Sequence, residues 1–167
     1  MDLLCGSARA LTRVLLACLL LVIVAGPASA DITGFMGATV SPATRPAPGV
    51  ALGLGHLFFA FEFEYARTTE DLEDRTPGLR TGMGNLLLQT PVAIAGIQPY
   101  FTTGAGMYQE QLGASTETSF GFNTRGGAKV HLAGPLRVRF DYRVFTLRGS
   151  PLADVVHRLY VGANLAF

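Results

Sequence analysis

Apolar and polar residues alternate along much of the chain, and residues 158–167 show the pattern most clearly. One face of this segment is apolar and consists of Leu159, Val161, Ala163, Leu165 and Phe167. The opposite face carries Arg158, Tyr160, Gly162, Asn164 and Ala166. Because the side chains of a β-strand point alternately to its two faces, this spacing predicts a strand with one apolar face.

The same reasoning predicts eight strands in all. They lie at about residues 32–40, 49–55, 57–67, 79–90, 98–109, 118–132, 136–147 and 158–167. The pattern is clearest in 57–67 and 136–147, and it is poor in 79–90. Phe, Tyr, Val and Thr are abundant outside the first 30 residues, which favours strands over helices.

The connections between these segments differ in length. Long polar or Pro-rich links are expected at 41–48, 68–78, 110–117 and 148–155, and tight turns at 55–56 and 133–135. The link at 91–97 is of medium length and unusually apolar. Long and short links that alternate are typical of transmembrane barrels, whose external loops are long and whose periplasmic turns are short. The medium link is the exception to this alternation.

The end of the chain resembles the C-terminal signal of bacterial outer-membrane β-barrels. That signal reads polar, any, Gly, any, any, apolar, any, aromatic, and its specified places are filled here by Tyr160, Gly162, Leu165 and Phe167. Leu165 departs from the family, which often has an aromatic residue there. The resemblance implies that the barrel-insertion machinery recognises this strand.

Residues 1–30 have the features of a cleaved secretory signal peptide. Arg9 and Arg13 precede an apolar run over 14–25, and Ala28-Ser29-Ala30 provides an A-x-A cleavage site. The run is short for a membrane-spanning anchor. Cleavage before a lipidated Cys18 is the other alternative, but the apolar run continues past that residue.

Removal of residues 1–30 leaves a barrel domain over 31–167. This part contains no cysteine, so it has neither a disulfide framework nor a thiol metal site. Its eleven basic and eleven acidic side chains balance. That balance gives no basic footprint for nucleic acid.

Charged residues occupy the middle of several predicted strands, opposite the apolar faces. We expect a lumen charge network made of Glu62, Glu64, Arg125, Lys129, Arg137, Arg139, Asp141, Arg143 and Arg158. An eight-stranded barrel has room inside for side chains only, and buried ions need partners, so these charges favour a structural plug of ion pairs. A narrow anion-selective pore is the other interpretation. In a soluble barrel or sandwich, the same alternation would place the charges outside.

A second resemblance covers essentially Asp31–Phe167, is specific only in the last fifty residues, and is carried by residues 118–147. A Gly-rich strand, a short turn and a strand carrying Asp141-Tyr142-Arg143 resemble the outer-membrane β-barrel domain family, which includes the transmembrane domains of OmpA and OmpX. The resemblance implies an all-β fold, an eight-stranded antiparallel up-and-down transmembrane β-barrel in the bacterial outer membrane. Tyr65, Tyr108 and Tyr142 are expected near the external strand ends, as an interfacial girdle.

The family hosts several functions, and a structural or surface-interaction role fits this chain best. Some members deacylate lipid A with a His-x-Ser motif, which is absent here. His157 lies near Ser150 and Asp154 in sequence, so a lipid A-modifying hydrolase stays as an alternative. We predict no catalytic, cofactor-binding or metal-binding residue. The acidic segment 70–74 lacks the spacing of a calcium loop. The expected partners are outer-membrane lipid and lipopolysaccharide, with an external loop ligand unidentified.

Overall fold

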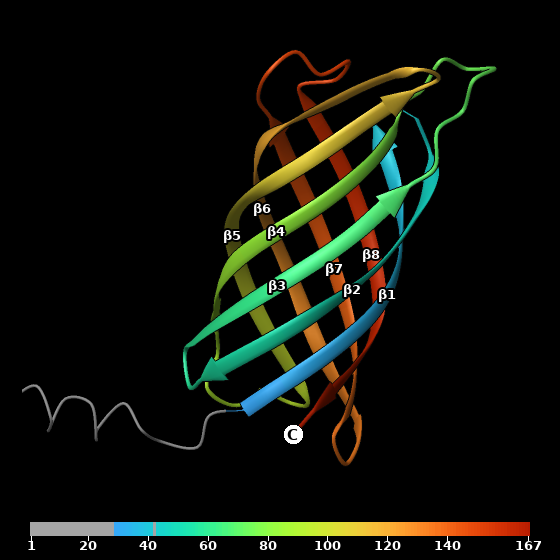
Figure 1. Cartoon of the computed structure of the whole chain (residues 1–167). Helices are drawn as coiled ribbons and strands as arrows, with labels where there is room; N and C mark the ends of the chain where they lie inside the picture. The colour runs from blue at the N-terminus through green and yellow to red at the C-terminus, as the bar shows by residue number, and fades with distance from the viewer. Residues whose placement is uncertain (1–28, 42) are drawn as a thin grey trace, which may run out of the picture.

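The computed structural model describes residues 29–41 and 43–167. Eight antiparallel strands form one closed barrel in chain order, and the first strand pairs with the last (Figure 1). The strands are β1 (Ser29–Ser41), β2 (Arg45–His56), β3 (Phe59–Thr68), β4 (Gly78–Gln89), β5 (Ile97–Leu112), β6 (Ser115–Ala133), β7 (Leu136–Leu147) and β8 (Val155–Ala166). The predicted fold, an eight-stranded antiparallel up-and-down barrel, is confirmed.

The two ends of the barrel differ. The links 69–77 and 148–154 lie at one end, which we call the loop end (Figure 1). The tight connections 57–58 and 134–135 lie at the other, the turn end, together with Phe167 and the start of β1. In the turn at 57–58, Leu57 has a φ of 48°. Within the described ranges, no helix has the length and hydropathy that crossing a bilayer requires.

Parts of two predicted loops, 41–48 and 110–117, belong to strands in the structure. Residues 45–48 extend β2 along β1, from Arg45 opposite Thr39 to Pro48 opposite Met36, before pairing with β3 begins at Gly49. Proline is tolerated there because this stretch is paired on one side only.

The prediction of a loop over the polar segment 110–117 is also wrong for most of its length. β5 and β6 continue through it, with Glu110 opposite Glu117, and turn only at 113–114. Both faces of the hairpin are polar at this height, so the alternation that identifies a strand disappears while the backbone pairing persists.

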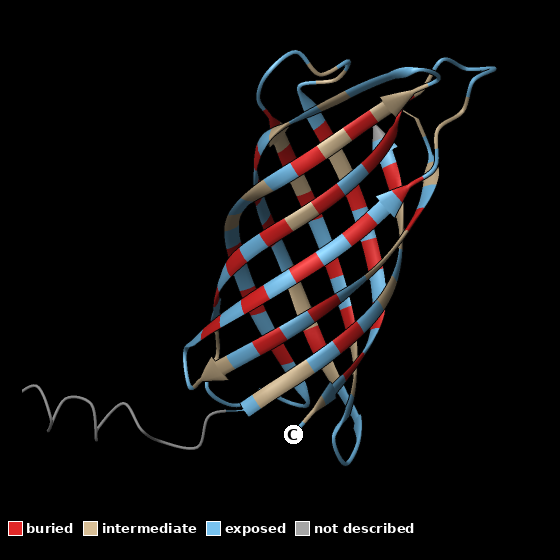
Figure 2. Ribbon diagram, in the orientation of Figure 1, coloured by how far each residue is buried: buried red, intermediate tan, exposed pale blue. Residues whose placement is uncertain are grey.

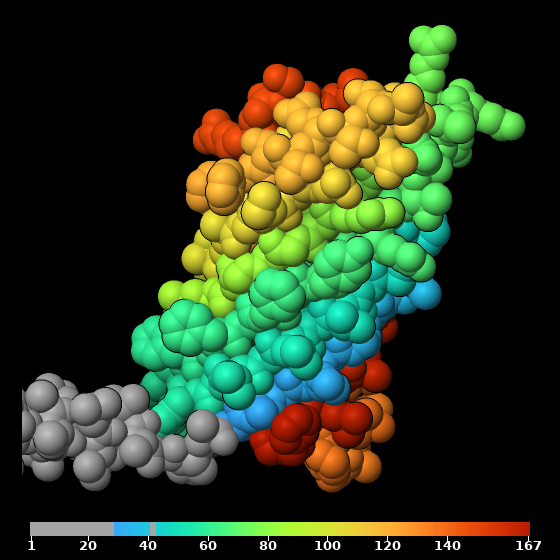
Figure 3. All heavy atoms as spheres, viewed as in Figure 1, coloured from blue at the N-terminus to red at the C-terminus, as the bar shows by residue number. Residues whose placement is uncertain are grey.

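The barrel is apolar outside and polar inside. In every strand, buried and exposed residues alternate along the middle of the strand (Figure 2). The outward apolar side chains form a surface that we call the apolar belt, and Figure 3 shows it over β1–β5. Its larger exposed members include Ile32, Leu52, Leu54, Phe59, Phe61, Phe63, Leu86, Leu88, Phe101, Phe122, Phe140, Leu159, Val161 and Leu165.

Candidate functional site

The candidate site is the interior of the barrel. Among the described residues, this is where polar and charged side chains are buried together. Its middle layer is a cluster of ion pairs that joins strands from opposite walls. Glu62 on β3 pairs with Arg125 on β6 and Arg139 on β7. Glu64, also on β3, pairs with Arg125 and with Arg143 on β7. Each carboxylate therefore bridges two arginines across the lumen.

Asp141 and Tyr100 complete this middle layer. Oδ2 of Asp141 lies 2.9 Å from Nε of Arg139. The Tyr100 hydroxyl donates a hydrogen bond to Asp141 and accepts one of 2.7 Å from Nε of Arg139. Burial of a charge costs several kcal/mol unless partners replace the lost water, and these contacts supply such partners.

The other predicted network residues lie apart from this cluster. Toward the turn end, Nζ of Lys129 lies 2.8 Å from Oδ2 of Asp31 on β1. Arg137 donates a hydrogen bond of 3.4 Å to Gln98. Arg158 is fully buried nearer the loop end, and in the described residues no carboxylate lies within 4.0 Å of it.

Sequence reasoning missed two residues of the interior. Asp31 pairs with Lys129 across 98 positions of sequence, which no local pattern reveals. Tyr100 shares the inward face of β5 with Thr102, so strand parity could have placed it in the lumen. Its role as a link between an acid and an arginine required the structure.

The loop end of the interior is filled mainly by apolar side chains, with the buried carboxylate of Glu110 among them. This apolar plug consists of Leu79, Met83, Tyr108, Phe145, Leu147 and Val156, with Ala153 of the loop 148–154 packed against it. Two carboxylates hold that loop in place. Glu110 accepts a hydrogen bond of 2.9 Å from the backbone N–H of Leu152, and Glu117 accepts one of 2.6 Å from that of Ser150.

The predicted tyrosine girdle is partly wrong. Tyr65 and Tyr142 are exposed on the outer surface, but Tyr108 is buried in the apolar plug and donates a hydrogen bond of 2.6 Å to the carbonyl of Arg148. Tyr108 has the same strand parity as Tyr100, so its side chain must point inward. The hydroxyl of Tyr142 lies 2.7 Å from Nδ1 of His157.

The residues of the predicted insertion signal all lie on β8 or directly after it. Tyr160 and Gly162 face the interior, and Leu165 and Phe167 face outward. The backbone of Phe167 exchanges two hydrogen bonds of 2.8 Å with Ala30, the last residue of the predicted signal peptide. The seam between β1 and β8 itself runs from Asp31 opposite Ala166 to Ser41 opposite His157. The signal-peptide prediction for 1–30 falls mostly on residues 1–28, which lie outside the described residues.

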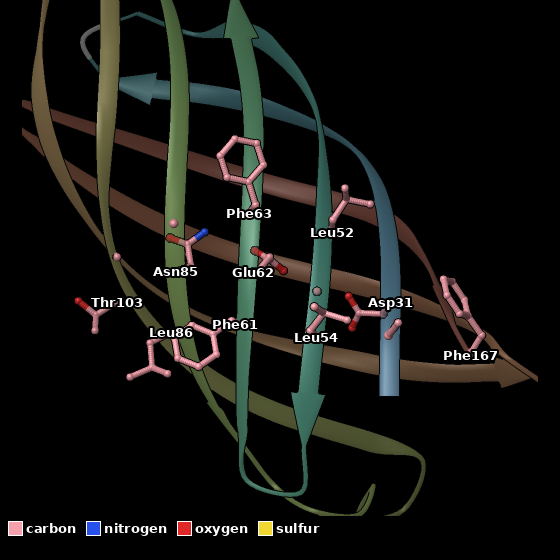
Figure 4. Close-up of a pocket in the computed structure, with 14 residues that line it drawn as sticks. Asp31, Leu52, Leu54, Phe61, Glu62, Phe63, Asn85, Leu86, Thr103 and Phe167 are labelled. Atoms are coloured by element: carbon pink, nitrogen blue, oxygen red, sulfur yellow. The ribbon is translucent and has the colours of Figure 1, made fainter. Parts of the chain in front are cut away.

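Figure 4 shows an open groove on the outer surface of β2–β5 at the turn-end half of the belt. Its volume is about 810 Å³. Phe61 and Leu86 lie side by side along it, Phe63 lies farther along β3, and Phe167 and the start of β1 line its other end. Among the described residues, no group of three or more His, Cys, Asp or Glu side chains could hold a metal ion.

Comparison with known proteins identifies the fold. No protein-family model matches the chain, and no curated protein matches it in sequence. Solved structures do match it. The N-terminal β-barrel domain of Pseudomonas aeruginosa OprF aligns with a TM-score of 0.62 at 14% identity, over 83% of this chain and 97% of that one. Neisserial surface protein A aligns with a TM-score of 0.59 at 15% identity, over 83% and 94%.

A third structure, the attachment invasion locus protein Ail of Yersinia pestis, was solved in complex with the heparin analogue sucrose octasulfate. It aligns with a TM-score of 0.52 at 12% identity, over 84% of this chain and 98% of that one. At these identities the similarity lies in the fold. The chain therefore has the eight-stranded barrel fold of the OmpA-like outer-membrane proteins, as the sequence predicted.

Proposed function

We propose that this protein is an integral barrel of the bacterial outer membrane with a structural or surface-interaction role. The observation that carries the proposal is the inverted distribution of residues, because large apolar side chains cover the outside while ionised groups fill the inside. The exposed fraction is 70% for Phe61 and 0% for Arg143. In water such a surface would be an aggregation hazard, whereas hydrocarbon matches it.

The orientation follows from the two ends. The short turns and Phe167 face the periplasm, and the loops 69–77 and 148–154 face outward, as in other outer-membrane barrels. The outer surface binds membrane lipid and lipopolysaccharide, and β8 presents the insertion signal to the insertion machinery after residues 1–30 are removed. The external loops are available to a surface partner, and nothing in the charge distribution favours nucleic acid.

The interior serves as a plug rather than as a pore or an active site. Charged and apolar layers together fill the lumen over most of its length. For the hydrolase alternative, His157 would have to meet Ser150 and Asp154, but its ring bonds to Tyr142 on the outer surface. We therefore propose no enzymatic role, cofactor or metal.

The test is fractionation followed by electrophoresis in detergent, with unheated and boiled samples compared. A protein that enters the outer-membrane fraction and changes mobility on boiling supports the proposal. A protein found in the soluble periplasmic fraction, with no change in mobility, overturns it. Mass spectrometry of lipid A from cells with and without the protein tests the hydrolase alternative, and we expect identical lipid A.

A further inference from the structure

Two arginines face outward side by side near the loop end of the barrel. Arg67 on β3 and Arg80 on β4 are directly opposite each other in the strand register. Both are exposed. Gln109 on β5 is the next residue in the same row, opposite Arg80, and its Oε1 lies 3.5 Å from Nη1 of Arg80.

This row marks the upper limit of the apolar belt. Two residues closer to the turn end, the equivalent row consists of Tyr65, Gly82 and Met107. A strand rises about 3.3 Å per residue and the strands of a barrel tilt by about 35–45°, so the arginines lie roughly 5 Å above that row along the barrel axis. In a barrel that spans a membrane, the arginines are therefore at the depth of the lipid headgroups, in the leaflet nearer the loops.

The two positive charges are not neutralised by the protein. In the part of the chain that the structure describes, no carboxylate lies within 4.0 Å of Arg67 or Arg80. The nearby Glu70 accepts a hydrogen bond of 2.8 Å from the backbone N–H of Gly113, which directs one of its oxygens to the neighbouring hairpin. Like charges directly opposite each other in a sheet are destabilising, so this pair calls for an anion from outside.

The surface around the arginines can hold such an anion. A groove of about 320 Å³ lies between the ends of β3, β4 and β5. It is lined by both arginines, Gln109 and Gln111, and by one acid, Glu70, so that two positive charges face a single negative one. Guanidinium groups and side-chain amides are donors, and two arginines suit the several oxygens of a phosphate group.

An apolar track runs down the outer surface of β4 from this groove. Gly82 and Gly84 follow Arg80 on the same face, and a methyl group at Gly82 would meet no atom within 4 Å. Beyond them lies the apolar groove lined by Phe61, Phe63 and Leu86 (Figure 4). At Gly84 a methyl group would meet only the carbonyl oxygen of Ala105, at 3.8 Å, so the outer surface of β4 is free of side chains at both glycines.

We propose that Arg67 and Arg80 bind a phosphate group of lipid A, with an acyl chain lying along Gly82 and Gly84 of β4. The inference rests on the proposed function, which places the loop end in the outer leaflet, where lipopolysaccharide is the phosphate-bearing lipid. It assigns a single site on one side of the barrel, rather than general contact with lipid around the belt.

Native mass spectrometry of the folded barrel in detergent tests the assignment. The probes are bisphosphorylated lipid A and the same lipid after removal of its phosphates. The variants are the double change Arg67→Gln with Arg80→Gln and, as a matched control, Arg148→Gln, which removes one exposed arginine at the same end of the barrel. The mobility change on boiling is measured for each preparation, so that loss of folding is recognised.

We expect the wild type and Arg148→Gln to retain one phosphorylated lipid A molecule. The double variant should bind it roughly 10- to 100-fold more weakly, since charge-assisted hydrogen bonds are lost. It should match the affinity of the wild type for the dephosphorylated lipid. Equal binding of both lipids by a barrel that changes mobility on boiling would overturn this inference alone. A wild-type chain that neither fractionates with the outer membrane nor changes mobility would overturn the proposed function as well.

Discussion

The guanidinium carbon of Arg158 lies 4.8 Å from the ring centroid of Phe145. This contact lies where the charged middle layer of the barrel meets the apolar plug. Nη1 of Arg158 also donates to the Tyr160 hydroxyl at 3.2 Å and to Thr81 at 3.4 Å. Arg158 is thus stabilised by an aromatic face and neutral oxygens, whereas Arg143 on the adjacent strand binds the carboxylate of Glu64.

This difference predicts opposite effects of one substitution at two neighbouring positions. Arg143→Met deprives buried Glu64 of a partner, and should lower the free energy of unfolding by about 3 kcal/mol. Arg158→Met removes a buried charge that no acid balances, and should leave the free energy of unfolding unchanged or raise it by about 1–2 kcal/mol. Because the chain has no tryptophan, the measurement is a urea titration followed by electrophoretic mobility. Equal destabilisation by both changes would contradict the assignment of partners.

The layered interior predicts that the protein does not conduct ions. The apolar plug at the loop end and the ion pairs below it occupy the lumen in the described residues. Purified protein in a planar bilayer should show no steady conductance, and the Arg139→Glu variant should show none either. A steady current that this change alters would instead support the pore.

Side-chain alternation predicted most of the strands and which residues share a face, because burial in a barrel has a period of two. The inward direction of the charged face and the closed eight-stranded barrel came from the resemblance to outer-membrane barrels, because a soluble barrel has the same alternation. Alternation could not predict partners across the lumen. Lys129 meets Asp31 and not one of the predicted acids, since pairing depends on strand tilt and register around the whole barrel. The strand pairing within the hairpin at 110–117 was not predicted because polar residues lie on both faces there, so the alternation of apolar and polar residues stops.

A close approach between β1 and β8 predicts a position that tolerates no side chain. A methyl group on Gly37 would lie 2.1 Å from Cδ1 of Tyr160 and 2.8 Å from the carbonyl of Leu159. Gly37→Ala should therefore cost about 1–3 kcal/mol of unfolding free energy. Gly34→Ala is the control on the same strand, because its methyl group would meet no atom within 4 Å. Urea titration of both variants is the measurement, and equal stability would contradict the expected clash.

The carboxylates that hold the loop 148–154 predict its sensitivity to proteolysis. Glu117→Ala removes the acceptor for the N–H of Ser150, so the loop should open more often, and trypsin should cut after Arg148 roughly tenfold faster. Glu73→Ala removes an exposed acid from the other long loop and should leave this cleavage unchanged. Mass analysis of the fragments over time measures both rates. Unchanged cleavage in Glu117→Ala would show that Glu110 and the apolar plug fix the loop without Glu117.

The seam at which β1 pairs with β8, from Asp31 opposite Ala166 to Ser41 opposite His157, has a consequence for biosynthesis. All other strand pairs join neighbours in sequence. The pair of β1 and β8 joins residues more than a hundred positions apart, so it can form only after β8 has been synthesised. A chain that stops before β8 would present two open sheet edges, which are prone to pair with other chains. Closure therefore distinguishes finished from unfinished polypeptides, because only a chain that contains β8 can cover both of these edges.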